Sequence, residues 1–332
     1  MTYSIGGLIE ATDYNTFAGN TTAGLNRVWS TGSGDAGWGQ TSISTVSSSG
    51  VVTATNWATL VNTLSTTGSQ STTTLTSRTA PVTGNLVAIL ANVQTDITNC
   101  TTNRGNATSS GTISTTWTGS IAKTTDTGTT TKPGTAWTIV WTQTITFASA
   151  DAARYFWNAG GLVRLDMSKT STGRDIDSDW NSFVGTVGTL FVSGRVNSAA
   201  QTIAGVSYTG FTRSGGSGTP SPNLTTTGWY SLTAGAGATT MWQLAQTVYP
   251  YTSEFIRVTA AVDATRTILT LVTTWNQGTQ TNATGITGGT NTASPYTAFG
   301  TAPAVLCRFI PPSTAQGLSD SWGTPTVASS IV

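Results

Sequence analysis

The alternation of residues 137–147 constrains the fold of this chain more than any other feature of its sequence. Large apolar side chains recur on one side of the segment, at Trp137, Ile139, Trp141, Ile145 and Phe147. The other side carries small, mostly hydroxylic residues, at Thr138, Val140, Thr142, Thr144 and Thr146. A period of two predicts a β-strand with one face buried and the other in water, which is typical of antiparallel sheets.

Other segments extend this prediction over most of the chain. Short runs rich in β-branched and aromatic residues, separated by turn residues, lie at 112–121, 161–167, 190–196, 203–211, 224–232, 255–262 and 268–275. In the first run Ile113, Trp117 and Ile121 share a face, so we expect Trp117, like Trp137 and Trp141, to point into the core. Many short strands of this kind favour an antiparallel β-sandwich or barrel-like domain.

The first hundred residues predict short helices instead, at residues 10–17, 24–29, 53–64 and 81–100. Thr12 or Asp13 is the expected N-cap of the first of these helices, and Thr55 that of the third. The apolar stripe of the last helix is the clearest, with Leu86, Ile89, Leu90, Val93 and Ile97 at steps of three and four. One further helix is expected from Asp179 to Val184.

The predicted fold is therefore mainly β with a small helical N-terminal region. We divide the chain into a helical attachment region (1–110), an antiparallel β-sandwich-like domain (111–310) and an extended C-terminal tail (311–332). The tail is expected to lie over a neighbouring copy or over its own domain. Residues 277–299 are interpreted as a long surface loop.

Composition excludes several classes of function. The 332 residues contain no histidine, so a Ser-His-Asp triad, a Cys-His pair and an HExxH zinc site are ruled out. Fourteen basic and 13 acidic residues give a net charge of +1, which provides no field for nucleic-acid phosphates. We expect neither a nucleic acid nor a membrane as a partner, because no run approaches the ~20 apolar residues of a bilayer span.

The N-terminus has no basic segment followed by a long apolar one, so no secretory signal peptide is predicted. Cys100 and Cys307 lie far apart in the sequence. Two alternatives remain: the cysteines form one disulfide, or both are reduced, buried thiols. The second alternative is favoured for a protein made in the cytosol.

Acidic residues offer two candidate sites. Asp175, Asp177 and Asp179 alternate as in a calcium loop, but the glycine and the distal glutamate of an EF-hand are missing. The competing interpretation, a solvated turn that caps the following helix, is favoured. The two glutamates, Glu10 and Glu254, are the candidates for paired carboxylates in glycoside cleavage, although scattered acids are usually structural. Asp166 is expected to pair with Arg164 on one strand face.

Tryptophan outside the strands offers a third candidate site. Trp38, flanked by glycines, and Trp322, near the C-terminus, are predicted to be exposed or to contact another subunit, although a packing role is the commoner one for such residues. The glycine-rich segment 214–218 lacks the end of a phosphate-binding loop and is interpreted as a turn. No cofactor is expected.

Several segments resemble virion structural proteins of tailed bacteriophages, particularly phages of marine cyanobacteria. They are residues 6–15 (GGLIEATDYN), 29–34 (WSTGSG), 37–40 (GWGQ), 53–57 (TATNW), 153–161 (ARYFWNAGG) with Arg164, 180–181 (WN) and 187–189 (VGT). Such proteins are defined by their place in the particle, so the resemblance transfers no catalytic residue.

The resemblance and the composition together lead to one functional expectation. The chain is expected to be a non-enzymatic virion component, made in the host cytoplasm and released by lysis. We expect an exterior, tail-associated, fibre-like or baseplate-like position and a role in assembly and host attachment. The alternatives are a head decoration protein, a carbohydrate-binding adhesin and, last, a polysaccharide depolymerase.

The expected partners are copies of the chain itself, with a trimer as one candidate symmetry, other virion proteins and a host-surface glycan. The aromatic residues with which we expect the chain to attach to its partners are Tyr14, Trp29, Trp38, Trp57 and Trp322.

Overall fold

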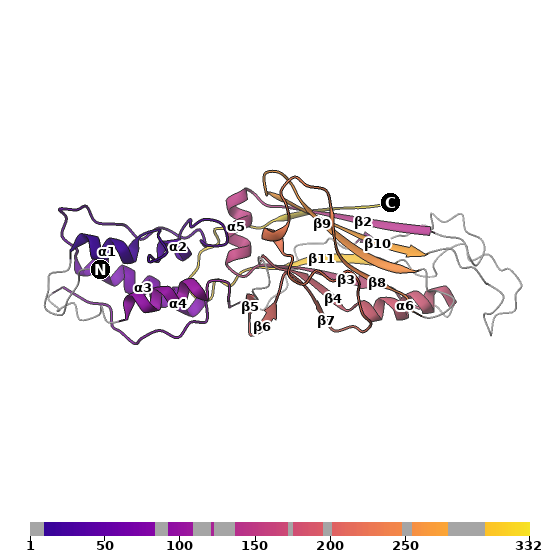
Figure 1. Cartoon of the computed structure of the whole chain (residues 1–332), viewed down its shortest axis with the longest axis horizontal. Coiled ribbons are helices and arrows are strands. Elements are labelled where there is room, and N and C mark those ends of the chain that lie inside the picture. The colour runs from indigo at the N-terminus through magenta and orange to yellow at the C-terminus, as the bar shows by residue number, and fades with distance from the viewer. Residues whose placement is uncertain are drawn as a thin grey trace, which may run out of the picture.

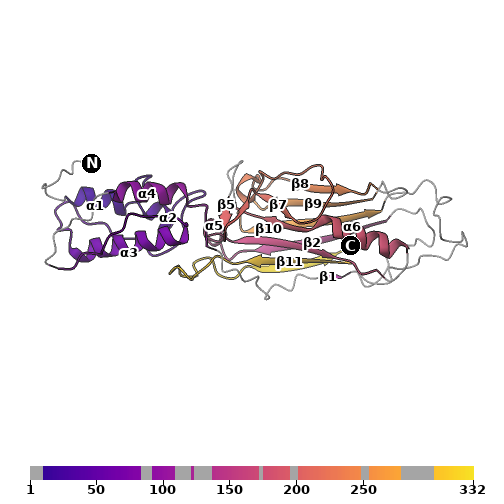
Figure 2. The same cartoon turned by 90° about the horizontal axis from the view of Figure 1, so that it is seen from below.

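The protein is elongated, with a group of helices at one end and a β-sandwich at the other (Figure 1). This computed structural model describes residues 10–83, 92–108, 121–122, 137–171, 175–194, 201–247, 254–277 and 303–332. The strands of the sandwich run along the long axis of the molecule in both views (Figure 2).

Two antiparallel five-stranded sheets form the sandwich. The first has the order β1-β11-β3-β4-β7, the second has the order β12-β2-β10-β9-β8, and β5 and β6 form a separate hairpin. The strands are β1 (Ile121–Ala122), β2 (Trp137–Thr146), β3 (Leu162–Ser168), β4 (Thr189–Val192), β5 (Gln201–Ile203), β6 (Val206–Tyr208), β7 (Phe211–Ser214), β8 (Thr239–Ala245), β9 (Phe255–Val262), β10 (Ile268–Gln277), β11 (Ala304–Ile310) and β12 (Thr326–Ile331). The predicted fold class, mainly β with a sandwich-like antiparallel domain, is confirmed, and in the described part of the chain neither sheet closes into a barrel.

The period-two pattern decides which side chains form the core between the sheets. Trp141 is fully buried, and its ring centroid lies 5.0 Å from that of Trp275 on the neighbouring strand β10. Trp275 in turn stacks on Trp180 at 5.3 Å and 2°. Rings of this size remove large apolar areas from water, at about 25 cal/mol per Å², and dominate the stability of such a core.

The helices are α1 (Ala11–Ala18), α2 (Asn26–Trp29), α3 (Ala54–Gln70), α4 (Val93–Thr102), α5 (Ala150–Asn158) and α6 (Asp175–Val187), with a short 3₁₀ turn, η1, at Trp229–Ser231. The first four pack around a core of their own, formed by Tyr14, Phe17, Ala18, Leu25, Ile43, Trp57, Leu60, Leu64, Val93, Ile97 and Cys100. The small helical N-terminal region predicted from the sequence is therefore present.

Two predicted caps are wrong by two or three positions. Helix α1 begins after Glu10, and Glu10 and Asp13 form a reciprocal capping box, so neither Thr12 nor Asp13 is the N-cap. Helix α3 begins after Thr53, whose side chain accepts a hydrogen bond from the Asn56 amide, so Thr55 lies inside the first turn. In both helices the polar residue three positions after the cap completes the box.

Several predicted elements have different boundaries or do not form. The helix expected at 81–100 begins only at Val93 in the described residues, and 84–91 lie outside them. Residues 203–211 do not form one strand, because Ala204 and Gly205 both have positive φ and turn the chain into the β5–β6 hairpin. Residues 224–232 contain the 3₁₀ turn η1 rather than a strand.

The predicted positions of Trp117 and Ile113 and almost all of the loop at 277–299 lie outside the described residues, as does the side chain of Trp137. The described part of the C-terminal tail lies on its own domain. Its strand β12 extends the second sheet by pairing with β2, from Thr326 opposite Thr146 to Ile331 opposite Trp141.

Candidate functional site

Helix α5 joins the two parts of the molecule, because it lies between the helical region and the sandwich, across the long axis (Figure 1). Ser149 caps it by accepting a hydrogen bond from the Ala152 amide at 3.0 Å. Its last turn carries three consecutive aromatic residues and Asn158, all of them buried. We call α5 and the segments that contact it the junction; these segments are residues 30–40, 229–231 and 319–322.

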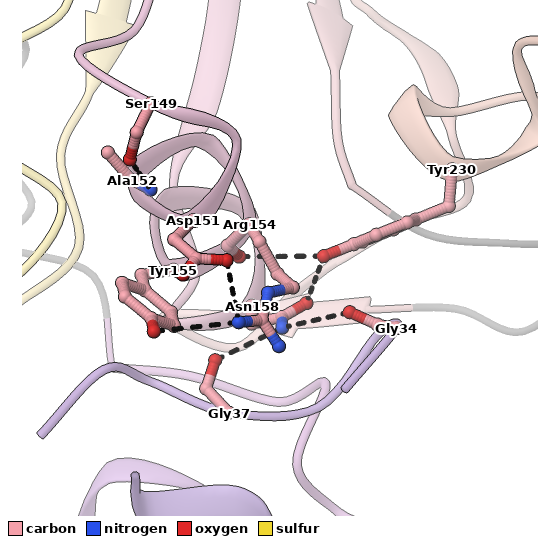
Figure 3. Close-up of polar contacts among 9 residues, drawn as sticks. All are labelled: Gly34, Gly37, Ser149, Asp151, Ala152, Arg154, Tyr155, Asn158 and Tyr230. Atoms are coloured by element: carbon pink, nitrogen blue, oxygen red, sulfur yellow. Dashed lines mark hydrogen bonds and ion pairs between the residues drawn. The ribbon is translucent and has the colours of Figure 1, made fainter. Parts of the chain in front are cut away.

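Asn158 bonds to both parts of the molecule at once (Figure 3). Its Nδ2 donates to the Gly37 carbonyl at 3.1 Å and lies 3.5 Å from the Gly34 carbonyl, on the loop that follows α2. Its Oδ1 accepts a hydrogen bond from the Tyr230 hydroxyl at 2.8 Å. Because the residue is only 6 % exposed, these bonds are shielded from water and costly to break.

The loop is held against α5 by close backbone approach. Gly39 has φ of +71°, and a Cβ at this position would lie 2.3 Å from the Tyr155 ring. Trp38, the preceding residue, donates from Nε1 to the Asn158 carbonyl at 3.0 Å and belongs to the core of the sandwich. Glycine is therefore required at position 39 both for its left-handed backbone and for the contact.

A second attachment joins the loop to the C-terminal segment. Gln40 donates from Nε2 to the Ser319 carbonyl at 3.0 Å, and its Oε1 accepts from the Ser319 amide and hydroxyl, both at 2.7 Å. The Ser321 hydroxyl donates to the Trp38 carbonyl at 2.6 Å. These bonds connect residues that are about 280 positions apart in the sequence.

Two ion pairs involve residues of the junction. Arg104, just after α4, contacts Asp35 at 2.8 Å, and Arg154 on α5 contacts Asp151 at 2.9 Å. The Arg154 guanidinium also lies 5.0 Å above the Tyr155 ring. Each pair is partly exposed, so its net contribution to stability is about 1 kcal/mol or less.

A small cavity lies inside the junction. It measures ≈ 10 Å³ and is lined by Asp35, Gly105, Trp157, Asn158, Gly194, Gln201 and Tyr230. Two polar atoms of these residues, Trp157 Nε1 and Gln201 Oε1, are buried without a hydrogen-bond partner among the described residues. Burial in the same place raises the pKa of the Tyr230 phenol, so it stays protonated and donates to Asn158.

This arrangement makes the junction stiff rather than reactive. Most of its polar groups are paired with one another, and Trp157 stacks on Trp229 at 5.6 Å beneath them. Packing and hydrogen bonding thus fix the helical region at one end of the sandwich, which is the mechanical property that a rigid spacer or subunit requires.

Sequence reasoning did not single out Asn158, Gln40 or Tyr230 as members of a site. Segments 37–40 and 153–161, both of which combine glycine with aromatic residues, are the two sides of the junction. They lie more than 110 residues apart, so only the structure brings them together.

The predicted exposure of Trp38 and Trp322 is wrong. Trp38 is 1 % exposed and Trp322 is 4 % exposed, and both belong to the core of the sandwich. The glycines around Trp38 allow close backbone contacts with α5 and do not hold the indole in solvent.

The other three aromatic residues expected to attach the chain to partners lie within the helical region. Tyr14 and Trp57 are both 1 % exposed and contact each other at 5.4 Å, while Trp29 is half-buried and donates from Nε1 to the Thr41 carbonyl. Tyr14 and Trp57 therefore offer almost no surface of their own, and they support the shape of the helical end from within.

The acidic triplet does not form a calcium loop. Asp175, Asp177 and Asp179 lie in the first turns of helix α6, where residues two positions apart point in different directions. The side chains of Asp175 and Asp177 lie outside the described residues. Within the described part of the chain, no group of three or more His, Cys, Asp or Glu side chains has the spacing of a metal site.

Asp179 instead hydrogen-bonds to the carboxyl group of Glu254, which is fully buried at the start of β9. Gln246 Nε2 also donates to Asp179 Oδ1 at 3.3 Å. Burial raises the pKa of Asp179, and the hydrogen bonds from Glu254 and Gln246 offset this only in part. The other glutamate, Glu10, is the exposed N-cap of α1 at the far end of the molecule, so the two glutamates do not form a pair (Figure 1).

The remaining sequence predictions concern pairing. Arg164 and Asp166 form the expected ion pair, with Arg164 Nε 2.8 Å from the carboxylate.

Cys100 and Cys307 are both unpaired and buried, as favoured. Burial raises the pKa of the Cys100 thiol to about 11 and raises that of Cys307 as well, so both thiols are protonated and weakly nucleophilic at neutral pH. The segment 214–218 is a turn with three left-handed glycines.

Comparisons with known proteins add no assignment to these observations. No family model, no curated protein and no solved structure matches this chain. Among the described residues, no helix has the length and apolar character needed to cross a bilayer.

Proposed function

We propose that this protein is a structural component of a tailed-bacteriophage virion, exterior and tail-associated, without enzymatic activity. The observation that carries the proposal is the junction. Segments 37–40 and 153–161, two of the segments that carry the resemblance to phage virion proteins, contact each other and fix the helical end to the β-sandwich.

The outer face of the second sheet supports assembly from several copies. Its outward residues on β2, β9 and β10 are mainly Thr, together with Val, Ala, Asn, Phe255 and Ile268, and Arg257 is the one charged residue among them. Five strands of 6 to 10 residues, at ~3.3 Å per residue and ~4.8 Å spacing, present roughly 650 Å², somewhat less than the ~800 Å² per partner of a stable interface. Contacts across such a face would depend little on salt.

The decisive experiment locates the chain on the particle. We expect its peptides to co-purify with density-gradient particles in a fixed ratio to the major capsid protein, and we expect a reconstruction to show the helical end against the tail. A chain that stays in the soluble lysate fraction would contradict the proposal, and density on the capsid lattice would favour the head decoration protein instead.

Oligomeric state is tested separately. Native mass spectrometry of the purified chain should show a homo-oligomer, and Thr142→Glu, which places a charge in the centre of the sheet face, should convert it to monomer. The matched change Thr12→Glu, on an exposed position of α1, should leave the oligomer intact. A wild-type chain that is monomeric at every concentration would argue against assembly through this face.

A further inference from the structure

The outer face of the first sheet carries a row of four residues across four strands. Arg308 on β11 lies directly opposite Arg164 on β3, Arg164 lies opposite Phe191 on β4, and Phe191 lies opposite Thr212 on β7. We call these four residues the arginine row. Directly opposed side chains on a sheet have Cβ atoms about 4.5–5.5 Å apart, so the two arginine side chains leave the sheet at neighbouring positions.

Only one of the two cations of the row is balanced by an acid. Arg164 pairs with Asp166 on its own strand, and Asp166 also accepts a hydrogen bond from Thr189. Arg308 is half-buried and forms neither an ion pair nor a hydrogen bond in the described part of the chain. Like charges directly opposite each other destabilise a sheet. In a chain with only 8 % charged residues, this unbalanced pair is the strongest local concentration of positive charge on the described strands.

Hydrogen-bonding and aromatic groups surround the cations. The Arg164 guanidinium lies 6.0 Å from the centre of the Phe191 ring, and Tyr208, from the hairpin over this face, meets Phe191 edge to face at 5.3 Å. Burial raises the pKa of Tyr208 although Arg164 acts to lower it, so its hydroxyl remains a donor at neutral pH. The Thr212 hydroxyl accepts from the Thr209 amide and keeps its own proton free to donate.

We propose that the arginine row binds the carboxylate or sulfate group of an acidic sugar. Arg308 supplies the forked pair of N–H donors that matches a planar or tetrahedral anion. Tyr208 and Thr212 lie where hydroxyl groups of the same sugar unit can be bound.

The position of the row on a sheet face favours a glycan over an acidic peptide. Peptides that bind to sheets usually add a strand at an edge, because free backbone N–H and C=O groups are available only there. The strands β3 and β4, which carry Arg164 and Phe191, are paired on both sides, so recognition in the middle of the row depends on side chains. A ligand rich in hydroxyl groups with one anionic substituent fits such a surface. This inference stands whether or not the chain belongs to a virion.

The experiment titrates the full chain by calorimetry with a uronic-acid disaccharide, a sulfated disaccharide, the neutral parent disaccharide and sodium sulfate. We expect at least one acidic disaccharide to bind, and the neutral one to bind at least about tenfold more weakly. Arg308→Gln should weaken binding by about tenfold or more. Because Arg308 has no partner to lose, we expect the variant to fold with unchanged or slightly raised thermal stability.

Arg257→Gln is the matched control, because Arg257 also points outward, beside an aromatic ring (Phe255, 5.2 Å), but on the other sheet. It should leave the affinity unchanged. The proposal is overturned if neither acidic disaccharide binds, or if both arginine variants weaken binding equally. Sodium sulfate binding as tightly as the sulfated sugar would exclude a sugar site. Tighter, Arg308-dependent binding of an acidic hexapeptide would assign the row to a protein partner instead.

Discussion

Asn158 is the residue on which the junction depends most directly. It links the loop at Gly37, the end of α5 and the 3₁₀ turn at Tyr230 through buried hydrogen bonds. An amide is suited to this place because one group must donate to a carbonyl while the other accepts from a phenol. Aspartate would lose the donor and valine would lose both.

Replacement of Asn158 by alanine should destabilise the protein by about 2–3 kcal/mol, because it leaves the Gly37 carbonyl and the Tyr230 hydroxyl with unmet hydrogen bonds in a buried site. Denaturant unfolding followed by tryptophan fluorescence measures the change. Asn181→Ala is the control, since Asn181 is exposed on α6 and should change stability by less than about 0.5 kcal/mol. Equal effects of the two variants would contradict the role given to Asn158.

Asp179 makes a prediction about pH. Its folded-state pKa is raised, so the folded protein holds this proton more tightly than the unfolded chain does. The resulting stabilisation is complete below the unfolded pKa of about 3.9 and is lost as the pH rises through the folded pKa. Asp179→Asn cannot ionise, so it should resemble the wild type in thermal stability near pH 4 and exceed it near pH 8.

The control for this prediction is Asp151→Asn, because Asp151 is largely exposed and lies on a different helix. It should keep the wild-type pH dependence. If Asp179→Asn loses stability with rising pH as steeply as the wild type, a group other than Asp179 causes the loss of stability between pH 4 and pH 8.

Single residues also show where sequence reasoning failed. Trp38 between two glycines was a candidate for exposure or for contact with another subunit, with packing as the commoner role, and it is buried, because glycine permits close backbone contact as readily as it permits a mobile loop. The ion pair of Arg164 and Asp166 could be predicted, because two residues on one strand face meet by local geometry alone. Trp38 depends on a partner 120 residues away, which no local pattern reveals.

The helices and strands follow the same rule: those that depend on a local sequence pattern could be predicted, and those that depend on distant contacts could not. Strands β2, β9 and β10 were predicted within two residues of their ends, because each has one face in the core and a clean alternation. Helix α5 was missed because it is only nine residues long and six of them are buried, so its polar side is reduced to Asp151 and Arg154. The exposed edge strand β12 was missed because it is short and polar.

The N-cap of α3 gives an element-level prediction. Thr53→Ala removes the side-chain bond to the Asn56 amide and should cost about 1 kcal/mol of unfolding free energy. Thr55→Ala is a matched control two residues later, exposed and inside the helix, where alanine has the higher helix propensity and should be neutral or slightly stabilising. A larger loss of unfolding free energy in Thr55→Ala than in Thr53→Ala would identify Thr55 as the N-cap instead.

At the level of the whole molecule, three long-range attachments converge on α5 and its neighbours. The loop after α2, the turn at Tyr230 and the segment around Ser319 come from widely separated parts of the chain, and each is held by buried or half-buried hydrogen bonds. The helical end and the sandwich should therefore move as one body. The sequence contains the groups that make these bonds but no local sign that they meet.

Rigidity of the whole molecule can be tested at Gly39. Gly39→Ala places a Cβ 2.3 Å from the Tyr155 ring, which forces the loop away from α5 and should cost about 1–3 kcal/mol beyond the backbone strain. Gly34→Ala is the matched control, because Gly34 also has positive φ but has nothing within 4 Å of the added atom. Small-angle X-ray scattering should show one elongated shape for the wild type and for Gly34→Ala. Gly39→Ala should show a broader distribution of maximum dimensions, together with faster hydrogen exchange in α5. Identical scattering and exchange in the two variants would mean that the contact between Gly39 and Tyr155 does not hold the two ends of the molecule in line.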